Sequence, residues 1–215
     1  MRWLVSMAVA LGLALTGSAA PAQAPGYIET FDEGSDPADV MAGVLLIGED
    51  GAWSGRLEDG VYKLANRDKS GAIRYFHLGR RGSAARPGSV KLFGVDVAGR
   101  FSSDVAGAGL IYRFDRQART YFAFVITRDG YGVWQRGRDG FRRVAAGSNE
   151  AIKAEEPNSL IVQLASGRAR LFVNETQVLA HSVKGGTGGD IGIIAIDRGE
   201  FLFDNFKLAG DRQAR

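Results

Sequence analysis

Short runs of alternating apolar and polar residues fill the chain between positions 27 and 208, and this period of two predicts β-strands. In one run, Leu110, Tyr112 and Phe114 share a face of the expected strand. Similar runs lie at 122–126, 160–164, 171–173, 191–195 and 201–203. We therefore expect about a dozen strands.

Turn dipeptides separate these runs. Asp-Gly between two alternating segments is a strong hairpin signal, because a tight type I′ turn needs positive φ at both central residues. The sequence offers Asp50-Gly51, Asp59-Gly60, Asp129-Gly130, Asp139-Gly140 and Ser166-Gly167 at such places. The strands are therefore expected to be antiparallel and joined mainly by hairpins.

Helical patterns are sparse. The segment 148–156 could form a short helix ended by Pro157, or a single turn within a loop. The segments 80–88 and 185–189 read as loops because they are rich in glycine and small or charged residues. The pattern predicts an all-β protein, a two-sheet antiparallel sandwich spanning 25–210 as one domain, with a polar tail at 211–215.

The first residues form a separate element. One charge at Arg2, an apolar run at 4–15 and the small residues before Ala22 are typical of a secretory signal peptide. Cleavage is expected after Ala22, giving a signal peptide of 1–22, with Ala24 as the other possible site. The run is too short for a good membrane span, so we expect a periplasmic or extracellular protein without stable membrane insertion after cleavage.

Charge and cysteine content narrow the function further. Removing residues 1–22 removes one arginine and no acid, which leaves 26 basic and 24 acidic residues. Such a weak net charge argues against a nucleic-acid partner, which would need a concentrated basic face. The chain has no cysteine, so neither disulfides nor thiol ligands contribute. The zinc alternative would need both His77 and His181 plus distant carboxylates.

Three motifs together resemble the concanavalin A-like lectin/glucanase superfamily, most closely its laminin-G-like and glycanase-related bacterial domains. They are GLIYR at 109–113 followed by the aromatic-rich segment 121–134, LFVN at 171–174 with Glu175 in place of the usual glycine, and FDNF at 203–206. This resemblance implies a jelly roll of two curved sheets, with any glycan lying across the concave face. It indicates a fold more specifically than an activity.

Hydrolytic members of that superfamily carry carboxylates in an E-x-D-x-x-E arrangement on one strand, where two acids on the same face can cleave a glycosidic bond. This sequence has no such series. The missing motif favours a protein that is not an enzyme, without deciding the matter, and no catalytic residue is predicted. A glycoside hydrolase or lyase with an atypical site would gain support if two carboxylates, or His77 and a carboxylate, converged on the concave face.

Aromatic and arginine side chains give the candidate ligand site. Sugar rings stack on tryptophan and tyrosine, and arginine can bridge hydroxyl groups. The ligand-binding candidates are Arg113, Tyr121, Trp134, Arg136 and His77. The alternative is that these aromatics are core and the arginines flank hairpins. Trp134 and Gln135 must point to opposite faces unless a bulge intervenes.

Two further features carry weaker expectations. Four arginines at 136–143 surround Asp139-Gly140 and could attract an anionic polysaccharide, or could protect an edge strand from pairing with other chains. Asp32 and Asp204 are calcium candidates, although calcium needs six to eight oxygen ligands. No other metal or cofactor is expected.

The sequence as a whole predicts a secreted, non-catalytic carbohydrate-binding or surface-recognition module whose partner is a glycan or polysaccharide. The atypical glycoside hydrolase or lyase is one alternative. An envelope structural or adhesion protein with a protein partner is another, and a contiguous apolar surface patch would favour it.

Overall fold

The computed structural model describes residues 27–32, 44–78, 92–154, 156–183 and 189–209. These residues form fifteen strands and no helix. The strands are β1 (Tyr27–Glu29), β2 (Gly48–Asp50), β3 (Trp53–Glu58), β4 (Val61–Asn66), β5 (Ile73–His77), β6 (Leu92–Phe101), β7 (Gly107–Asp115), β8 (Thr120–Thr127), β9 (Gly130–Gly137), β10 (Gly140–Gly147), β11 (Asn158–Ala165), β12 (Arg168–Val173), β13 (Thr176–Ser182), β14 (Asp190–Ile196) and β15 (Gly199–Ala209).

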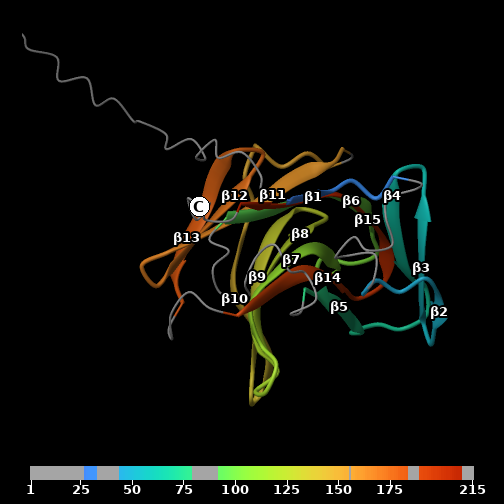
Figure 1. Ribbon diagram of the computed structural model, residues 1–215, viewed down its shortest axis with the longest axis horizontal. Helices are drawn as coiled ribbons and strands as arrows, with labels where there is room; N and C mark the ends of the chain where they lie inside the picture. Colours follow the sequence, from blue (N-terminus) through green and yellow to red (C-terminus); the bar gives the residue numbers. More distant parts are fainter. Residues whose placement is uncertain (1–26, 33–43, 79–91, 155, 184–188, 210–215) are drawn as a thin grey trace, which may run out of the picture.

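The strands build two antiparallel sheets that lie one over the other (Figure 1). Sheet A has nine strands in the order β13-β12-β11-β6-β15-β4-β3-β2, and β1 pairs with the last part of β15. Sheet B has six strands in the order β10-β9-β8-β7-β14-β5. The predicted all-β antiparallel sandwich is confirmed.

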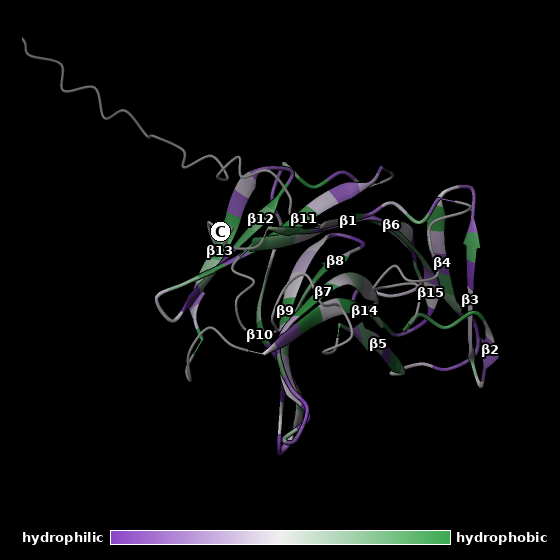
Figure 2. Ribbon diagram, in the orientation of Figure 1, coloured by the Kyte–Doolittle hydropathy of each residue, from purple (hydrophilic) through white to green (hydrophobic). Residues whose placement is uncertain are grey.

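The core lies between the two sheets and follows the alternation in the sequence. Phe124 and Ile126 of β8 are buried there against sheet A residues such as Val95 and Leu160, and Phe122 packs at the margin. Figure 2 shows this alternation as hydrophobic and hydrophilic colours that change along the strands. The prediction that 122–126 sends one face into the core is therefore confirmed.

The predicted hairpins occur, but in several of them the turn is displaced by one residue from the predicted dipeptide. Asp59-Gly60 and Ser166-Gly167 are two-residue turns with positive φ at both positions, as type I′ turns require. At Asp129-Gly130, however, Thr127 pairs with Gly130, so Arg128 and Asp129 form the loop and the glycine begins β9. The turn after β9 is shifted in the same way, because Gly137 pairs with Gly140.

The segment 148–156 forms a single turn within a loop as far as it is described. The Asn149 side chain accepts the Ala151 amide, and the Ile152 amide donates to the Asn149 carbonyl. No described helix is long and apolar enough to cross a membrane. The expected signal peptide, the loop 80–88, most of the segment 185–189 and the tail 211–215 lie outside the described residues.

The turn between β12 and β13 holds a glutamate in a backbone conformation suited to glycine. Asn174 and Glu175 have φ values of 46° and 69°. Asn174 is held by its own side chain, which accepts the Ser159 amide at 2.8 Å and donates to the Ala151 carbonyl at 2.7 Å. Among the described residues no hydrogen bond or ion pair holds the exposed Glu175, which bears the steric cost of the left-handed region.

We expect Glu175→Gly to stabilise the protein by about 1 kcal/mol, because glycine removes the Cβ clash at positive φ. This corresponds to a rise of about 3 °C in Tm for a domain of this size. Asn174→Gly in the same turn is the control, and should lower Tm because it deletes the three hydrogen bonds of the Asn174 side chain, to Ser159, Ala151 and Asn158. Thermal unfolding of the three proteins tests this. A lower Tm for Glu175→Gly would contradict the strain argument.

Candidate functional site

The outer face of sheet B, directed away from sheet A, carries a second apolar cluster. It is built from the residues of each strand that alternate with the core residues, such as Ala123 and Val125 of β8. Ile111 of β7 and Ile194 of β14 join them, and all four side chains are fully buried. The central strands of sheet B are therefore apolar on both faces, which an ordinary solvent-facing sheet surface would not require.

Aromatic rings cross this outer face from one edge of the sheet to the other. We call Tyr75, His77, Phe114, Tyr121, Phe141 and Trp134 the outer aromatic band. Its ring centroids are 4.3 Å apart for His77 and Phe114, 5.9 Å for Phe114 and Tyr121, 6.2 Å for Tyr121 and Phe141, and 5.0 Å for Phe141 and Trp134. Spacings of 4.5–7 Å are typical of favourable aromatic pairs.

Exposure differs along the band. Phe114 and Tyr121 in its middle are only 5% and 4% exposed, whereas Trp134 and Phe141 at one end are half-buried. Burial, assisted by the nearby Tyr75, raises the pKa of the Tyr121 hydroxyl. Tyr121, which the sequence predicted as a ligand-binding residue, is therefore too buried to contact a ligand directly and packs against the neighbouring rings. The ends of the band are the parts that a ligand can reach.

The Trp134 end borders a hollow of ≈ 260 Å³. The hollow is lined by Trp134 and Arg143, by the carboxylates Asp104 and Asp129, and by small residues of β9 and β10. The Arg143 guanidinium lies 5.9 Å from the Trp134 ring centroid, a cation–π geometry. An aromatic ring, a cation and two carboxylates that can accept hydrogen bonds from sugar hydroxyls form a combination of groups suited to binding one sugar residue.

Gly132 determines how Trp134 lies. A Cβ at position 132 would come within 2.9 Å of the indole Nε1, so the absence of a side chain lets the indole lie back over β9. The Nε1 atom is buried there without a hydrogen-bond partner. The parallel Phe141 ring, inclined by only 2°, packs on the same indole and helps to fix its position.

The His77 end holds a charged cluster. The Asp190 carboxylate, only 7% exposed, accepts the Arg116 Nε at 2.6 Å. Its Oδ2 also lies 3.1 Å from His77 Nδ1, but the two groups are not aligned for a hydrogen bond, so this contact is electrostatic. His77 and a carboxylate therefore converge on this face. Burial lowers the pKa of His77, Arg116 lowers it further, and Asp190 partly opposes both.

Arg113 is directed elsewhere. Its backbone has a φ of 56° at a bulge in β7, and its guanidinium donates to the Val183 carbonyl at 3.0 Å. Tyr112 contacts His181 at 2.6 Å, and the Tyr131 hydroxyl donates to the Val178 carbonyl. Arg113 thus belongs to a group of side chains that ties sheet B to the edge strand β13, and it does not join Trp134.

Arg136 lies beside the outer aromatic band. It pairs across the sheet with Tyr121 of β8 and Phe141 of β10, and its side chain is exposed. Gln135 is on the opposite face, where it accepts Arg142 at 2.5 Å. Trp134 and Gln135 therefore point to opposite faces, as the alternation predicts.

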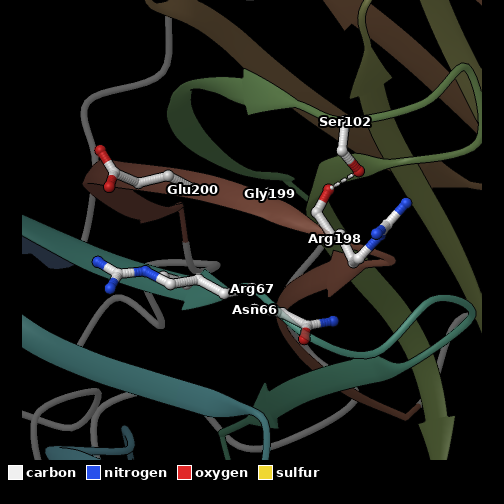
Figure 3. A pocket seen from close by; sticks show the side chains of 7 residues that line it. Asn66, Arg67, Ser102, Arg198, Gly199 and Glu200 are labelled. Atoms are coloured by element: carbon white, nitrogen blue, oxygen red, sulfur yellow. Dashed lines mark hydrogen bonds between the residues drawn. The ribbon is translucent and has the colours of Figure 1, made fainter.

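A larger hollow of ≈ 360 Å³ lies at the β14–β15 turn (Figure 3). No aromatic ring lines it, and its polar groups already serve the fold. Asn66 donates to the carbonyls of Lys69 and Asp197, and Ser102 donates to the Arg198 carbonyl. In Figure 3 its two arginines, Arg67 and Arg198, extend in different directions. This hollow is therefore a weaker ligand site than the one at Trp134.

The calcium candidates lie near each other but are already hydrogen-bonded. Asp204 accepts the backbone and side-chain N–H groups of Asn205, and Asp32 accepts the Thr30 hydroxyl. Burial raises the pKa of Asp204, and the charges of Asp96 and Asp32 add to this effect. Among the described residues no group of three acidic, histidine or cysteine side chains is arranged to hold a metal ion. Calcium binding stays a prediction.

No family model and no curated protein sequence matches the chain. Solved structures do resemble it. A carbohydrate-binding module of Bacillus subtilis, CBM66, matches with a TM-score of 0.56 and 14% identity over 74% of this chain and 92% of that one. The laminarinase catalytic domain of Thermotoga maritima matches with a TM-score of 0.61 and 9% identity, over 89% of this chain and 99% of that one. The fold is the two-sheet antiparallel jelly roll shared by these structures. A Bacillus subtilis protein of unknown function with a galectin-like fold matches with a TM-score of 0.60 and 13% identity, over 86% of this chain and 94% of that one.

The sequence analysis did not predict several residues of the outer face of sheet B. Tyr75 is distant from Trp134 in sequence and reaches the band only through strand order. Phe141 lies on the neighbouring arm of the same hairpin, and its stacking on Trp134 is a diagonal contact that depends on the exact register. Asp190 is brought to His77 by the pairing of β14 with β5. The one feature of the sequence that could have indicated a role for Asp190 is its charge at the start of the otherwise apolar run 190–196.

The two histidines of the chain give a direct test of the charged cluster. We expect both to titrate below the ordinary histidine pKa of about 6.5, since burial lowers both values. Asp190→Asn should lower the pKa of His77 further and leave that of His181 unchanged. NMR titration of the imidazole protons measures this, with His77→Gln for assignment. A raised His77 value in Asp190→Asn would contradict the contact.

The same shifts predict how stability depends on pH. The folded state binds these two protons less tightly than the unfolded chain, so the stabilising contribution is present above about pH 6.5 and is lost as pH falls through the folded pKa values.

We expect Asp204→Asn to raise Tm at pH 7 in metal-free buffer, because an amide resembles the protonated carboxyl that the site favours. Since the Asp204 pKa is raised, the gain should vanish at a pH below the ordinary aspartate value of about 3.9. A thermal scan with calcium chloride tests the calcium prediction. A calcium-dependent rise in Tm confined to the wild type would support it, and equal curves would overturn it.

Proposed function

We propose that this protein is a non-catalytic carbohydrate-binding module whose glycan lies on the outer face of sheet B, with Trp134 at the centre of the site. The observation that carries this proposal is the half-buried Trp134–Phe141 stack beside a hollow lined by Arg143, Asp104 and Asp129. Apolar ring faces next to a few polar groups fit a sugar, which has a C–H face and a rim of hydroxyls. The carbohydrate-binding, laminarinase and galectin-like neighbours support this chemistry.

The carboxylates of sheet B favour binding over hydrolysis. Its described strands carry two, Asp115 and Asp190, and both are engaged. Asp115 accepts the amides of Gln117 and Ala118, and Asp190 binds Arg116. At the hollow, the Asp104 side chain is 84% exposed, so it can accept hydrogen bonds from sugar hydroxyls. These observations support binding as the proposed activity, ahead of the acid and nucleophile chemistry of a retaining glycosidase.

Trp134→Ala is expected to weaken glycan binding by about tenfold or more, the effect typical of a central aromatic contact. The measurement is binding of the purified chain to an array of neutral and anionic glycans, followed by titration of the best one. Phe101→Ala is the matched control, since Phe101 is a partly buried aromatic of sheet A whose ring packs on Phe201 and does not line the hollow. Gly132→Ala tests the site without deleting a ring, because it displaces the indole.

Retained binding in both Trp134→Ala and Gly132→Ala would refute the proposed site. Equal losses in Phe101→Ala would show that the effect reflects general destabilisation, again against the site. Absence of binding to every glycan would refute the carbohydrate function and favour a protein partner. The described exposed apolar residues, such as Ile28, Leu57 and Val144, lie on separate strands and give that alternative little support.

An atypical glycoside hydrolase or lyase is the second candidate, and the His77–Asp190 contact is the observation in its favour. The same glycans are therefore incubated with the protein and assayed for chain cleavage. Cleavage that is lost in His77→Gln would establish the enzyme and overturn the non-catalytic proposal.

We further propose that the protein acts in the periplasm or outside the cell after removal of residues 1–22. The apolar run and the small residues before Ala22 support this. N-terminal sequencing of the protein from the exported fraction tests it. A mature chain that still begins at Met1 would overturn it.

A further inference from the structure

The hairpin formed by β9 and β10 carries an excess of positive charge beside the site. Its sequence at 136–143 contains four arginines and one acid, Asp139. Among the described residues, no ion pair includes any of these four arginines. Elsewhere, Arg74, Arg116 and Arg128 each approach an aspartate. The hairpin is therefore a concentrated cationic surface in a chain of nearly balanced charge.

The strand register places two of the four arginines on the same face as the aromatic rings. Arg143 pairs with Trp134 and Arg136 pairs with Phe141. The four side chains form a square in which the rings occupy one diagonal, stacked at 5.0 Å, and the arginines occupy the other. Arg142, in contrast, points to the opposite face with Gln135.

This arrangement resembles a built site more than a protected edge. β10 is the edge strand of sheet B, and charge on any of its positions would discourage pairing with other chains. Protection does not require the guanidinium groups to alternate with half-buried rings. Arg143 is held over the Trp134 ring, which restrains its side chain and reduces the entropy lost when its planar fork meets an acid group.

We propose that the glycan bound at this site is acidic, and that Arg136 and Arg143 bind its carboxylate or sulfate groups while Trp134 and Phe141 stack on its rings. This inference rests on the proposed glycan-binding function and names the ligand class. Carboxylate and sulfate share the planar or tetrahedral oxygen pairs that guanidinium binds in a bidentate manner.

The test compares ligands that differ only in charge. Polygalacturonate is paired with its methyl ester, and dextran sulfate with dextran, and each is titrated with the full chain at two salt concentrations. We expect tighter binding to an acidic member than to its neutral partner. The acidic member that binds more tightly identifies the group as carboxylate or sulfate. We also expect weaker binding at higher salt.

The double variant Arg136→Gln, Arg143→Gln should lose about tenfold or more in affinity for the acidic ligand and little for a neutral one. Arg168→Gln, Arg170→Gln is the matched control, because these exposed arginines lie on β12 of sheet A. Arg142→Gln controls for charge on the hairpin's other face. Circular dichroism establishes that each variant is folded.

The outcomes separate the two proposals. Binding that depends on Trp134 but is equal for acidic and neutral partners keeps the glycan site and overturns its acidic preference. Equal losses of affinity in the two double variants would mean that the acidic ligand binds through the net charge of the protein, which also overturns the acidic preference of the site. Binding that is indifferent to Trp134→Ala refutes the site itself, and failure of all ligands to bind refutes both proposals.

Discussion

Two-sided burial of the central strands of sheet B is the constraint on which the rest of the structure depends. In β8, Phe124 and Ile126 enter the core while Ala123 and Val125 are buried on the outer face. Because the side chains alternate strictly, a shift of one residue would exchange these two sets completely. The register of β8 therefore fixes Tyr121, and through the neighbouring strands it fixes the positions of Trp134 and Arg136 on one face.

At the β13 edge of sheet A, polar contacts join the two sheets in addition to apolar packing. Tyr112, Arg113 and Tyr131 of sheet B each reach β13 or the residue that follows it. Such buried hydrogen bonds add modest stability, but leaving one partner unpaired is costly, so they specify how the two sheets align. The contacts of Tyr112, Arg113 and Tyr131 with sheet A therefore help to position sheet B, and with it the site on its outer face.

The sequence predicted the fold well because strand alternation and turn chemistry are local signals. It located the hairpins, the core face of β8 and the opposite directions of Trp134 and Gln135. It could not place Asp190 beside His77 or Phe141 on Trp134, since those contacts depend on strand order and on diagonal neighbours across the sheet. Arg113 illustrates the same limit, because the bulge that turns it toward Val183 has no clear local signature.

The pairing of β1 with β15 has a consequence for how the chain folds. β15 lies in the interior of sheet A, between β6 and β4, and its last residues also hold β1. Sheet A is therefore completed by β15, the last of the described strands, and β1, the first of the described strands, gains its partner only then. Closing so long a loop is entropically costly and makes folding slow. A chain emerging from the ribosome would have to leave the backbone edges of β4 and β6 that face β15 unpaired until β15 had been synthesised.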